Sequence, residues 1–285
     1  MKKVVKSRPG RSVGGDMGNI VFLCVFGIFM LIPMVFIISN AFKPLDELFM
    51  YPPRLWVRNP TTDNFSSLST IFSDSLVPFS RYLFNTVFLT VATTVGQVII
   101  SSMAGYVLAK KKFPGRRIIF RLVVTSLLFT SAVTAIPNYL ILSKLGWIDS
   151  YMSIIVPAMG GSMGVFLIKQ FMENIPDTIL EAARVDGASE HRIFWLIVVP
   201  NVKPAWMTLV IFTVQSMWST TGGTYIYSEE LKTLQTALNQ IVSSGISRTG
   251  VSAAISLIMM AVPIATFIIS QKNVVQTMMS SGIKE

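Results

Sequence analysis

Long apolar runs without charge dominate the chain. A helix needs about 20 predominantly apolar residues to cross a bilayer core of about 30 Å. The runs here are continuous rather than alternating, which predicts membrane helices and not a barrel. The expected spans are residues 18–40, 82–109, 122–143, 150–168, 205–221 and 249–271. We therefore expect an all-α, polytopic membrane protein with six transmembrane helices, the fifth entered through a bend at Pro200 and Pro204.

The composition supports this interpretation. Of the 285 residues, 52% are hydrophobic and 13% are charged, whereas a soluble domain carries about 25% charged residues. This argues against a soluble enzyme and against a disordered regulator. The single cysteine, Cys24, and the single histidine, His191, predict neither an intrachain disulfide nor a metal site.

Basic residues precede the first apolar run, as they do in a signal peptide. The apolar core of a signal peptide has about 7–15 residues, and the run over residues 18–40 is longer. We therefore expect a retained first span.

Lys and Arg are distributed unevenly between the two sides that six spans create. Seventeen of the 24 fall on the side that carries both termini, and such an excess marks the cytoplasmic side. We thus expect a cytoplasmic tail at 1–17, a transmembrane domain over 18–285, an inner loop at 173–200, and outer loops at 41–81 and 222–248. The net charge of +10 follows from this excess and does not indicate a nucleic acid partner. The basic run at 110–117 is expected to contact anionic membrane lipid.

The centres of the expected spans hold no Asp, Glu, Lys, Arg or His. Ion-coupled carriers and channels with charged rings usually place such residues at membrane depth. The pattern therefore disfavours a stand-alone secondary carrier, although sodium sites built from carbonyls stay possible. An intramembrane enzyme is disfavoured too, since the chain has no cluster of acids and histidines at one depth.

The inner loop is the most informative segment. Pro176 suits the first turn of a helix, Asp177 favours the positive end of that helix, and Gly187 can end it in a left-handed conformation. A second helix is then expected to run toward Pro200. By itself this pattern fits any helix–turn–helix at a membrane surface.

The amino-acid sequence of the inner loop resembles a known family motif. Glu181-Ala182-Ala183, followed by Asp186-Gly187-Ala188-Ser189 and later by Pro200, resembles the EAA motif of ABC importer permeases. The fuller pattern is similar to the carbohydrate uptake branch, and most resembles the smaller permease subunit of maltose and oligosaccharide transporters. The likeness covers about residues 15–285 and implies the type I ABC importer permease architecture.

The resemblance implies a mechanism. In that family the EAA segment forms a coupling helix, which docks in a cleft of a cytoplasmic ATPase and couples ATP hydrolysis to alternating access. Glu181 would then pair with the ATPase, Ala182 and Ala183 would permit close approach, and Gly187 would make the turn. The residues so assigned to ATPase coupling are Glu181, Ala182, Ala183, Asp186, Gly187, Ala188 and Pro200.

The resemblance also implies partners and a location. These are a homologous second permease in a heterodimer, two ATPase subunits and an extracytoplasmic sugar-binding protein, all at a bacterial cell membrane, inner or plasma. The chain has no GxxxxGK[ST] phosphate loop. We therefore expect a non-catalytic transport subunit that binds no cofactor, with ATP and Mg held by the partner ATPase. Its solute would be a sugar or oligosaccharide, with a peptide, amino acid or polyamine as alternatives.

Two groups of residues are weaker candidates. Polar side chains within the expected spans either line a solute path or hold helices together; they are Asn85, Gln97, Asn138 and Gln215. Tyr225 and Tyr227 lie early in the second outer loop. They are candidates for binding-protein docking or for stacking on sugar rings, and the alternative is anchoring at the membrane interface.

Overall fold

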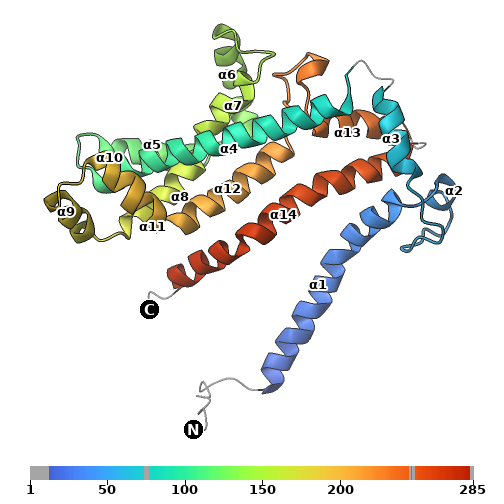
Figure 1. Cartoon of the computed structure of the whole chain (residues 1–285), viewed down its shortest axis with the longest axis horizontal. Coiled ribbons are helices and arrows are strands. Elements are labelled where there is room, and N and C mark those ends of the chain that lie inside the picture. Colours follow the sequence, from blue (N-terminus) through green and yellow to red (C-terminus); the bar gives the residue numbers. More distant parts are fainter. Residues whose placement is uncertain (1–12, 74–76, 244, 246–247, 283–285) are drawn as a thin grey trace. The chain divides into compact units, whose positions relative to one another are not determined.

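The computed structural model describes residues 13–73, 77–243, 245 and 248–282. Every regular element within these ranges is a helix, which confirms the all-α prediction (Figure 1). The helices are α1 Val13–Ala41, α2 Leu45–Leu48, α3 Asp63–Ser73, α4 Phe79–Lys110, α5 Arg116–Ser126, α6 Ser131–Lys144, α7 Met152–Met159, α8 Ser162–Glu173, α9 Asp177–Val185, α10 Glu190–Ile193, η1 Phe194–Val198, α11 Val199–Asn201, α12 Lys203–Trp218, η2 Glu229–Leu231, α13 Leu234–Ser243 and α14 Thr249–Gly282.

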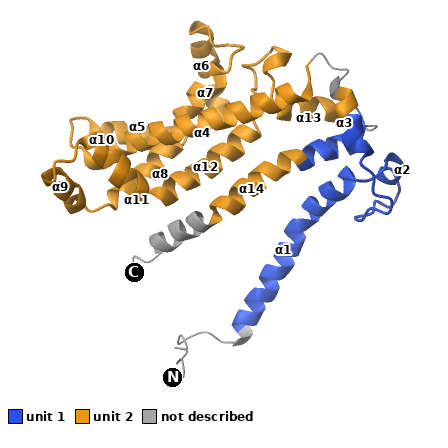
Figure 2. Cartoon of the chain, in the orientation of Figure 1, with its two compact units in different colours: residues 1–68, 245–257 blue, residues 69–244, 258–285 orange. Residues whose placement is uncertain are grey.

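The chain divides into two compact units. One contains residues 1–68 and 245–257, and the other contains residues 69–244 and 258–285 (Figure 2). In the first unit, α1 is apolar along its length, and its most apolar 18-residue window holds no buried residue. The segment that follows is fastened by Asn64, whose amide donates to the carbonyls of Ala41 and Lys43 at 3.0 and 2.8 Å.

The second unit is built around α4, which packs along α8, α12 and α7. Glycines make the α4–α8 crossing close. A Cβ on Gly164 would lie 2.4 Å from Ser101 Oγ, and one on Gly105 would lie 3.1 Å from the backbone nitrogen of Lys169. Small residues of this kind let membrane helices approach each other.

Two apolar clusters lie along α4. One contains Leu89, Ile154, Ile155 and Ile226. The other joins the last turns of α4 to α8 and to the segment 175–209, and its fully buried members include Ile168, Met172, Leu180, Ile193, Val198 and Leu209. This second cluster is the base on which α9 and α10 rest.

Four helical segments are long and apolar enough to cross a membrane: Gly15–Ala41, Phe79–Lys110, Met152–Glu173 and Thr249–Gln271. Two further pairs pass the same test when each counts as one bent span. These are Arg116–Ser126 with Ser131–Lys144, bent by 112°, and Glu190–Asn201 with Lys203–Trp218, bent by 75°. The described residues thus hold four to six candidate spans. The second bend lies at the expected Pro200–Pro204.

The helix expected over 122–143 differs from the structure. It is broken between Ser126 and Ser131, where Thr130 has an extended conformation with ψ at 155°. The amides of Leu128 and Phe129 bond three residues back, and Ser126 Oγ donates to the Val123 carbonyl. The helix breaks here because Ser and Thr side chains compete with helical backbone hydrogen bonds. The hydrophobicity of the run does not reveal this break.

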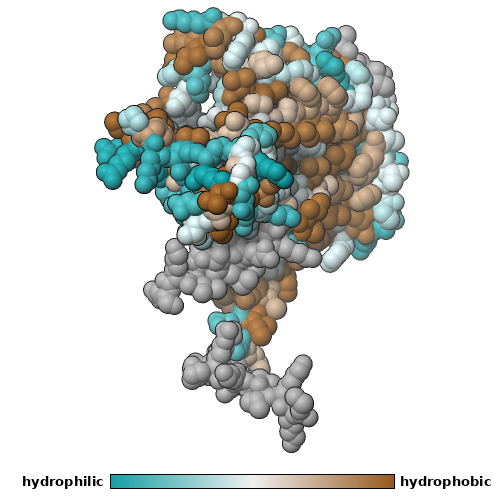
Figure 3. Space-filling model, turned by 60° about the vertical axis from the view of Figure 1, so that its left-hand side comes forward, coloured by the Kyte–Doolittle hydropathy of each residue, from teal (hydrophilic) through white to brown (hydrophobic). Residues whose placement is uncertain are grey.

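Large apolar side chains remain exposed on the second unit. Ile118, Leu122, Leu128 and Ile136 are each more than 60% exposed. Figure 3 shows brown hydrophobic residues over wide areas of one face, with teal hydrophilic residues gathered in a patch. A soluble monomer rarely exposes so much contiguous apolar surface.

Candidate functional site

The turn between α9 and α10 has the geometry expected of a glycine stop. Gly187 has a φ of 79°, in the left-handed region. Its N–H donates to the Arg184 carbonyl at 3.0 Å, and the Ala188 N–H donates to the Ala183 carbonyl at 3.0 Å. This pair of bonds is a Schellman motif, which satisfies the last carbonyls of α9. We call residues 177–193, which contain α9, this turn and α10, the elbow.

The motif residues divide between two faces of the elbow. Glu181, Ala182 and Asp186 are exposed, and neither acid makes a side-chain hydrogen bond or an ion pair within the described part of the chain. Ala183 and Ala188 are half-buried against the apolar cluster under Leu180. Part of the motif is therefore accessible to a partner, while the rest shapes the elbow itself. Pro200 lies on α11, outside the elbow, and is exposed.

Ion pairs fasten the elbow to the end of α4. Glu190 Oε1 lies 2.6 Å from Lys111 Nζ and 3.0 Å from Arg184 Nε, and Glu190 Oε2 accepts a hydrogen bond of 2.7 Å from the Tyr106 hydroxyl. Lys110 Nζ donates to Asp177 Oδ1 at 2.8 Å. That bond, with the charge of Lys110, holds the pKa of the Asp177 carboxyl below its ordinary value.

Sequence reasoning missed this network. The sequence predicts only lipid contacts for Lys110 and Lys111, and it predicts no role for Tyr106 or Glu190. The available signals were three consecutive lysines at the end of a long apolar helix and an acid directly after the Gly187 turn. Neither signal identifies its partner, because Tyr106 and Glu190 are 84 positions apart.

Two of the four path candidates are occupied by bonds within the chain. Asn85 is fully buried, and its amide donates to the carbonyls of Glu230 and Lys232, each at 2.8 Å, while its Oδ1 accepts from the Tyr151 hydroxyl at 2.6 Å. Gln97 accepts from the Thr213 hydroxyl and lies against Gly161. These geometries match the helix-packing alternative.

The other two candidates have no such bonds. Asn138 on α6 is half-buried, Gln215 on α12 is exposed, and neither makes a side-chain hydrogen bond within the described residues. In addition, α4 carries buried hydroxyls that have no hydrogen-bond partner among the described residues. They belong to Thr90, Thr93, Thr94, Ser101 and Ser102.

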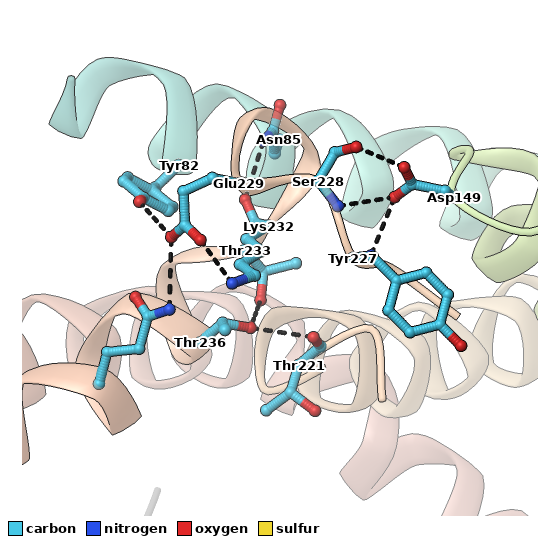
Figure 4. Close-up of polar contacts among 11 residues, drawn as sticks. Tyr82, Asn85, Asp149, Thr221, Tyr227, Ser228, Glu229, Lys232, Thr233 and Thr236 are labelled. Atoms are coloured by element: carbon cyan, nitrogen blue, oxygen red, sulfur yellow. Dashed lines mark hydrogen bonds and ion pairs between the residues drawn. The ribbon is translucent and has the colours of Figure 1, made fainter. Parts of the chain in front are cut away.

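At the opposite end of α4, hydrogen bonds hold the 219–233 loop (Figure 4). Asp149 accepts from the N–H groups of Tyr227 and Ser228, each at 2.9 Å, and from the Ser228 hydroxyl. These bonds hold the pKa of Asp149 below its ordinary value. Glu229 accepts from the Tyr82 hydroxyl at 2.7 Å and pairs with Lys232.

The structure brings the two candidate tyrosines together with a third. The hydroxyls of Tyr227 and Tyr139 lie 3.3 Å apart, and the ring centroids of Tyr225 and Tyr139 lie 6.5 Å apart at an interplanar angle of 20°. Tyr227 is 57% exposed. The loop therefore presents an aromatic group, with Tyr139 supplied by α6.

Acidic, histidine and cysteine side chains form no large cluster in the described part of the chain. No group of three or more His, Cys, Asp or Glu side chains there could hold an ion. Several acids instead pair with basic side chains, as Glu173 does with Lys169 at 2.7 Å.

Comparison with known proteins places this geometry in context. Residues 97–280 match the family described as "Binding-protein-dependent transport system inner membrane component". The chain is 31% identical over 228 residues to the polygalacturonan/rhamnogalacturonan transport system permease protein YtcP of Bacillus subtilis (strain 168), covering 79% of this chain and 77% of that protein. It is 28% identical over 265 residues to the arabinooligosaccharides transport system permease protein AraQ of the same organism, covering 92% and 94%.

A solved structure shares the fold. A chain from the crystal structure of a bacterial ABC transporter involved in the import of the acidic polysaccharide alginate matches with a TM-score of 0.79 and 24% identity, covering 93% of this chain and 99% of that one. The family match covers more than half of the chain, and the membership that the segment 181–200 predicted is confirmed. This chain belongs to the binding-protein-dependent transport system inner membrane components, the permeases of ABC importers.

Proposed function

We propose that the chain is the permease subunit of a binding-protein-dependent importer for a sugar or oligosaccharide. It forms half of the translocation pathway, and it couples ATP hydrolysis by partner subunits to alternating access. The observation that carries the proposal is the elbow, a short helix with an exposed Glu181–Ala182 surface, ended by a Schellman turn at Gly187. The names of the two relatives, which concern polysaccharide and oligosaccharide transport, support the solute class.

The membrane arrangement follows from counting each bent helix pair as one span. Six spans then place both termini on the side that carries most of the Lys and Arg, and this side is the cytoplasm of a bacterial cell. The elbow lies on that same side, where a soluble ATPase can reach it. The 219–233 loop lies on the other side, where an extracytoplasmic binding protein delivers solute.

The partners are a homologous second permease, two ATPase subunits and the binding protein. ATP and Mg belong to the ATPase subunits. The exposed acids Glu181 and Asp186 contact the ATPase, because a carboxylate without an internal partner is free to pair across an interface. Tyr225, Tyr227 and Tyr139 form a contact for the binding protein or its sugar.

The solute path uses polar groups that are not already bonded within the chain. Asn138 and Gln215 meet this condition, and so do the hydroxyls on α4. A buried hydroxyl without a partner costs free energy, and a hydroxylated solute or a rearranged helix contact can satisfy it. Asn85 and Gln97 hold helices and the 219–233 loop in place.

The proposal is tested by extracting the tagged chain from its native membrane in mild detergent and identifying what co-purifies by mass spectrometry. We expect a second permease and an ATPase with a phosphate-binding loop. Glu181→Lys should lose the ATPase and keep the second permease. The matched control is Glu173→Lys, since Glu173 already pairs with Lys169 and Arg116 and lies outside the elbow. A wild-type chain that purifies alone and still moves solute would overturn the proposal.

The solute class has its own test. The purified complex, reconstituted in vesicles with its binding protein, should show ATPase activity that increases with an oligosaccharide. Stimulation by an amino acid or polyamine instead would assign the chain to another branch of the family.

A further inference from the structure

α9 has a weak apolar hold on the rest of the molecule, whereas Ile193 at the end of α10 is fully buried. Within α9, only Leu180 is buried, with 2% of its surface exposed. One leucine and the half-buried Ala183 fix the position of a helix of nine residues poorly, because the helix can rotate about a single anchor. Something further must set the angle of α9 if the helix is to transmit force.

Glu190 supplies this further attachment. It occupies the first position of α10, shortly after the Schellman turn, and its two oxygens meet three donors, two at the end of α4 and one on α9. Tyr106 belongs to α4, Lys111 follows the last residue of α4, and Arg184 belongs to α9. A single carboxylate therefore connects α4, α9 and α10.

We propose that Glu190 is the positioning residue that clamps the elbow to α4, so that a displacement of α9 becomes a displacement of α4. The inference rests on the proposed coupling function. It adds a residue outside the set expected to touch the ATPase, and it states how motion leaves the elbow. α4 is the appropriate recipient, because it is an unbroken helix of 32 residues that packs along α7, α8 and α12.

The geometry explains why a glutamate serves here. Tyr106 is 6% exposed. Its ring centroid lies 5.4 Å from the ring centroid of Phe194, and Lys111 Nζ lies 5.7 Å from the centroid of the Tyr106 ring. The hydroxyl of Tyr106 is thereby held in one place. One oxygen of the side chain at position 190 must reach this hydroxyl, and the other oxygen must reach two cations. Aspartate, which is shorter by one methylene, can keep the charge but not all three contacts.

The neighbouring ion pairs do not substitute for Glu190. Lys169 and Arg116 both pair with Glu173. These pairs join α8 to the start of α5 and involve no residue of the elbow. Lys110 pairs with Asp177 at the start of α9, far along the helix from the turn, and the Asp177 side chain is 74% exposed. Glu173 is therefore a matched control, since it is a half-exposed glutamate with two cationic partners that lies outside the elbow.

The clamp itself is tested by a distance measurement on the assembled complex. In a Cys24→Ser background, spin labels are attached at Val107→Cys on α4 and Val185→Cys on α9, both of which are exposed in the wild type. Glu190→Gln should broaden the distance distribution between the labels, whereas Glu173→Gln should leave it unchanged. An unchanged distribution for Glu190→Gln would overturn the clamp.

The consequence for transport is tested in reconstituted vesicles. Glu190→Gln should lower the solute imported per ATP hydrolysed by about fivefold, in the range of typical coupling free energies, while the amount of ATPase that co-purifies stays at the wild-type level. Lys111→Met should give a smaller loss, and the double variant should lose no more than Glu190→Gln alone, because the Lys111 pair is one of the contacts that Glu190→Gln already weakens. Glu190→Asp should lie between wild type and Glu190→Gln.

The outcomes separate the two proposals. Absence of the ATPase from the wild-type complex would contradict the coupling function, and the label distances would still decide whether Glu190 clamps α9 to α4. Additive losses in the double variant, or a normal ratio of import to hydrolysis in Glu190→Gln, would overturn the clamp and leave the coupling function standing.

Discussion

The two ends of α4 are fastened in different ways. At the end near the 219–233 loop, buried neutral groups add to the charged contacts of Asp149 and Glu229: Asn85 and Thr86 are both 0% exposed and bond to backbone atoms of Glu230, Lys232 and Leu234. At the elbow end, the contacts are ion pairs between half-exposed side chains, with Lys111, Arg184 and Glu190 at 36%, 40% and 48% exposure.

The difference indicates which end resists displacement more strongly. Buried neutral hydrogen bonds are strong in a low dielectric and costly to break singly, so they hold one geometry. Exposed ion pairs contribute little free energy and are screened by salt, so they can be exchanged at small cost. We infer that the buried bonds fix the loop end more strongly than the half-exposed ion pairs fix the elbow end.

The largest effect is expected from Asn85→Leu. The substitution leaves the Lys232 carbonyl and the Tyr151 hydroxyl without the partner that Asn85 provides, while the Glu230 carbonyl keeps its bond from Arg81 Nε at 3.1 Å. The loss should cost about 2–4 kcal/mol of stability. The thermal unfolding temperature of the detergent-solubilised complex should fall, and the 219–233 loop should become sensitive to protease. Gln215→Leu is the control, because Gln215 is exposed and makes no side-chain hydrogen bond in the described part of the chain. Equal unfolding temperatures for the two variants would contradict the stronger attachment of the loop end.

Substitution at Gly187 is expected to have the next largest effect. A Cβ there would meet no atom within 4 Å, so the cost comes from the left-handed backbone alone and should be about 1–2 kcal/mol for Gly187→Val. Import should fall about tenfold while membrane insertion persists. Gly187→Asn should retain most activity, since Asn tolerates this conformation. Similar losses for Val and Asn would mean that the left-handed turn is not what the elbow needs.

Acid should release the 219–233 loop by a smaller amount. Because hydrogen bonds from Ser228 and Tyr227 depress the pKa of Asp149, its stabilisation is complete above the unfolded pKa of about 3.9 and is lost as the pH falls through the folded value. Proteolysis of the loop should therefore be constant between about pH 5 and 8 and increase below about pH 4. Asp149→Asn should be more susceptible at neutral pH, by about 1 kcal/mol, and should not change further with acid. A loop that opens between pH 5 and 7 would contradict this assignment.

Salt should have the smallest effect, and it should act more on the elbow than on the 219–233 loop, where Asn85 and Thr86 add neutral bonds to the Glu229–Lys232 pair. Raising the ionic strength from about 0.1 to 1 M shortens the screening length from about 10 to 3 Å and should weaken the exposed pairs by less than about 1 kcal/mol. The distance distribution between labels on α4 and α9 should broaden modestly, while the protease resistance of the 219–233 loop stays constant. Equal salt sensitivity at both ends would remove the contrast between them.

The expectations from sequence differ in how well they match the fold. The spans at 18–40, 82–109 and 249–271 coincide with single helices, because apolar periodicity and length are local properties. The span at 122–143 is two helices, because the apolar run conceals Ser126 and Thr130, whose preferences act through backbone hydrogen bonds. The turn at Gly187 was predictable, since only glycine adopts such a conformation freely.

The candidate site residues also differ in how much the sequence predicts about them. The motif from Glu181 to Pro200 was visible in sequence, and its role in ATPase coupling stays a prediction. Asn85 and Gln97 were visible as polar residues in apolar surroundings, yet sequence could not distinguish a path-lining group from a packing one. Asn85 bonds to the carbonyls of Glu230 and Lys232, and Gln97 bonds to the Thr213 hydroxyl. These partners lie more than 100 positions away along the chain.

What the sequence determined by itself is therefore local: the apolar helices, the glycine turn of the elbow and the motif that identifies the family. The tertiary structure alone decided which charges meet, since Glu190 and Tyr106 are 84 positions apart, and Tyr82 and Glu229 are 147 apart. The physical reason is that hydrophobicity and backbone preference act over a few neighbouring residues. A hydrogen bond or ion pair needs atoms within about 3 Å, and only the packing of α4 against the rest of its unit brings these atoms together.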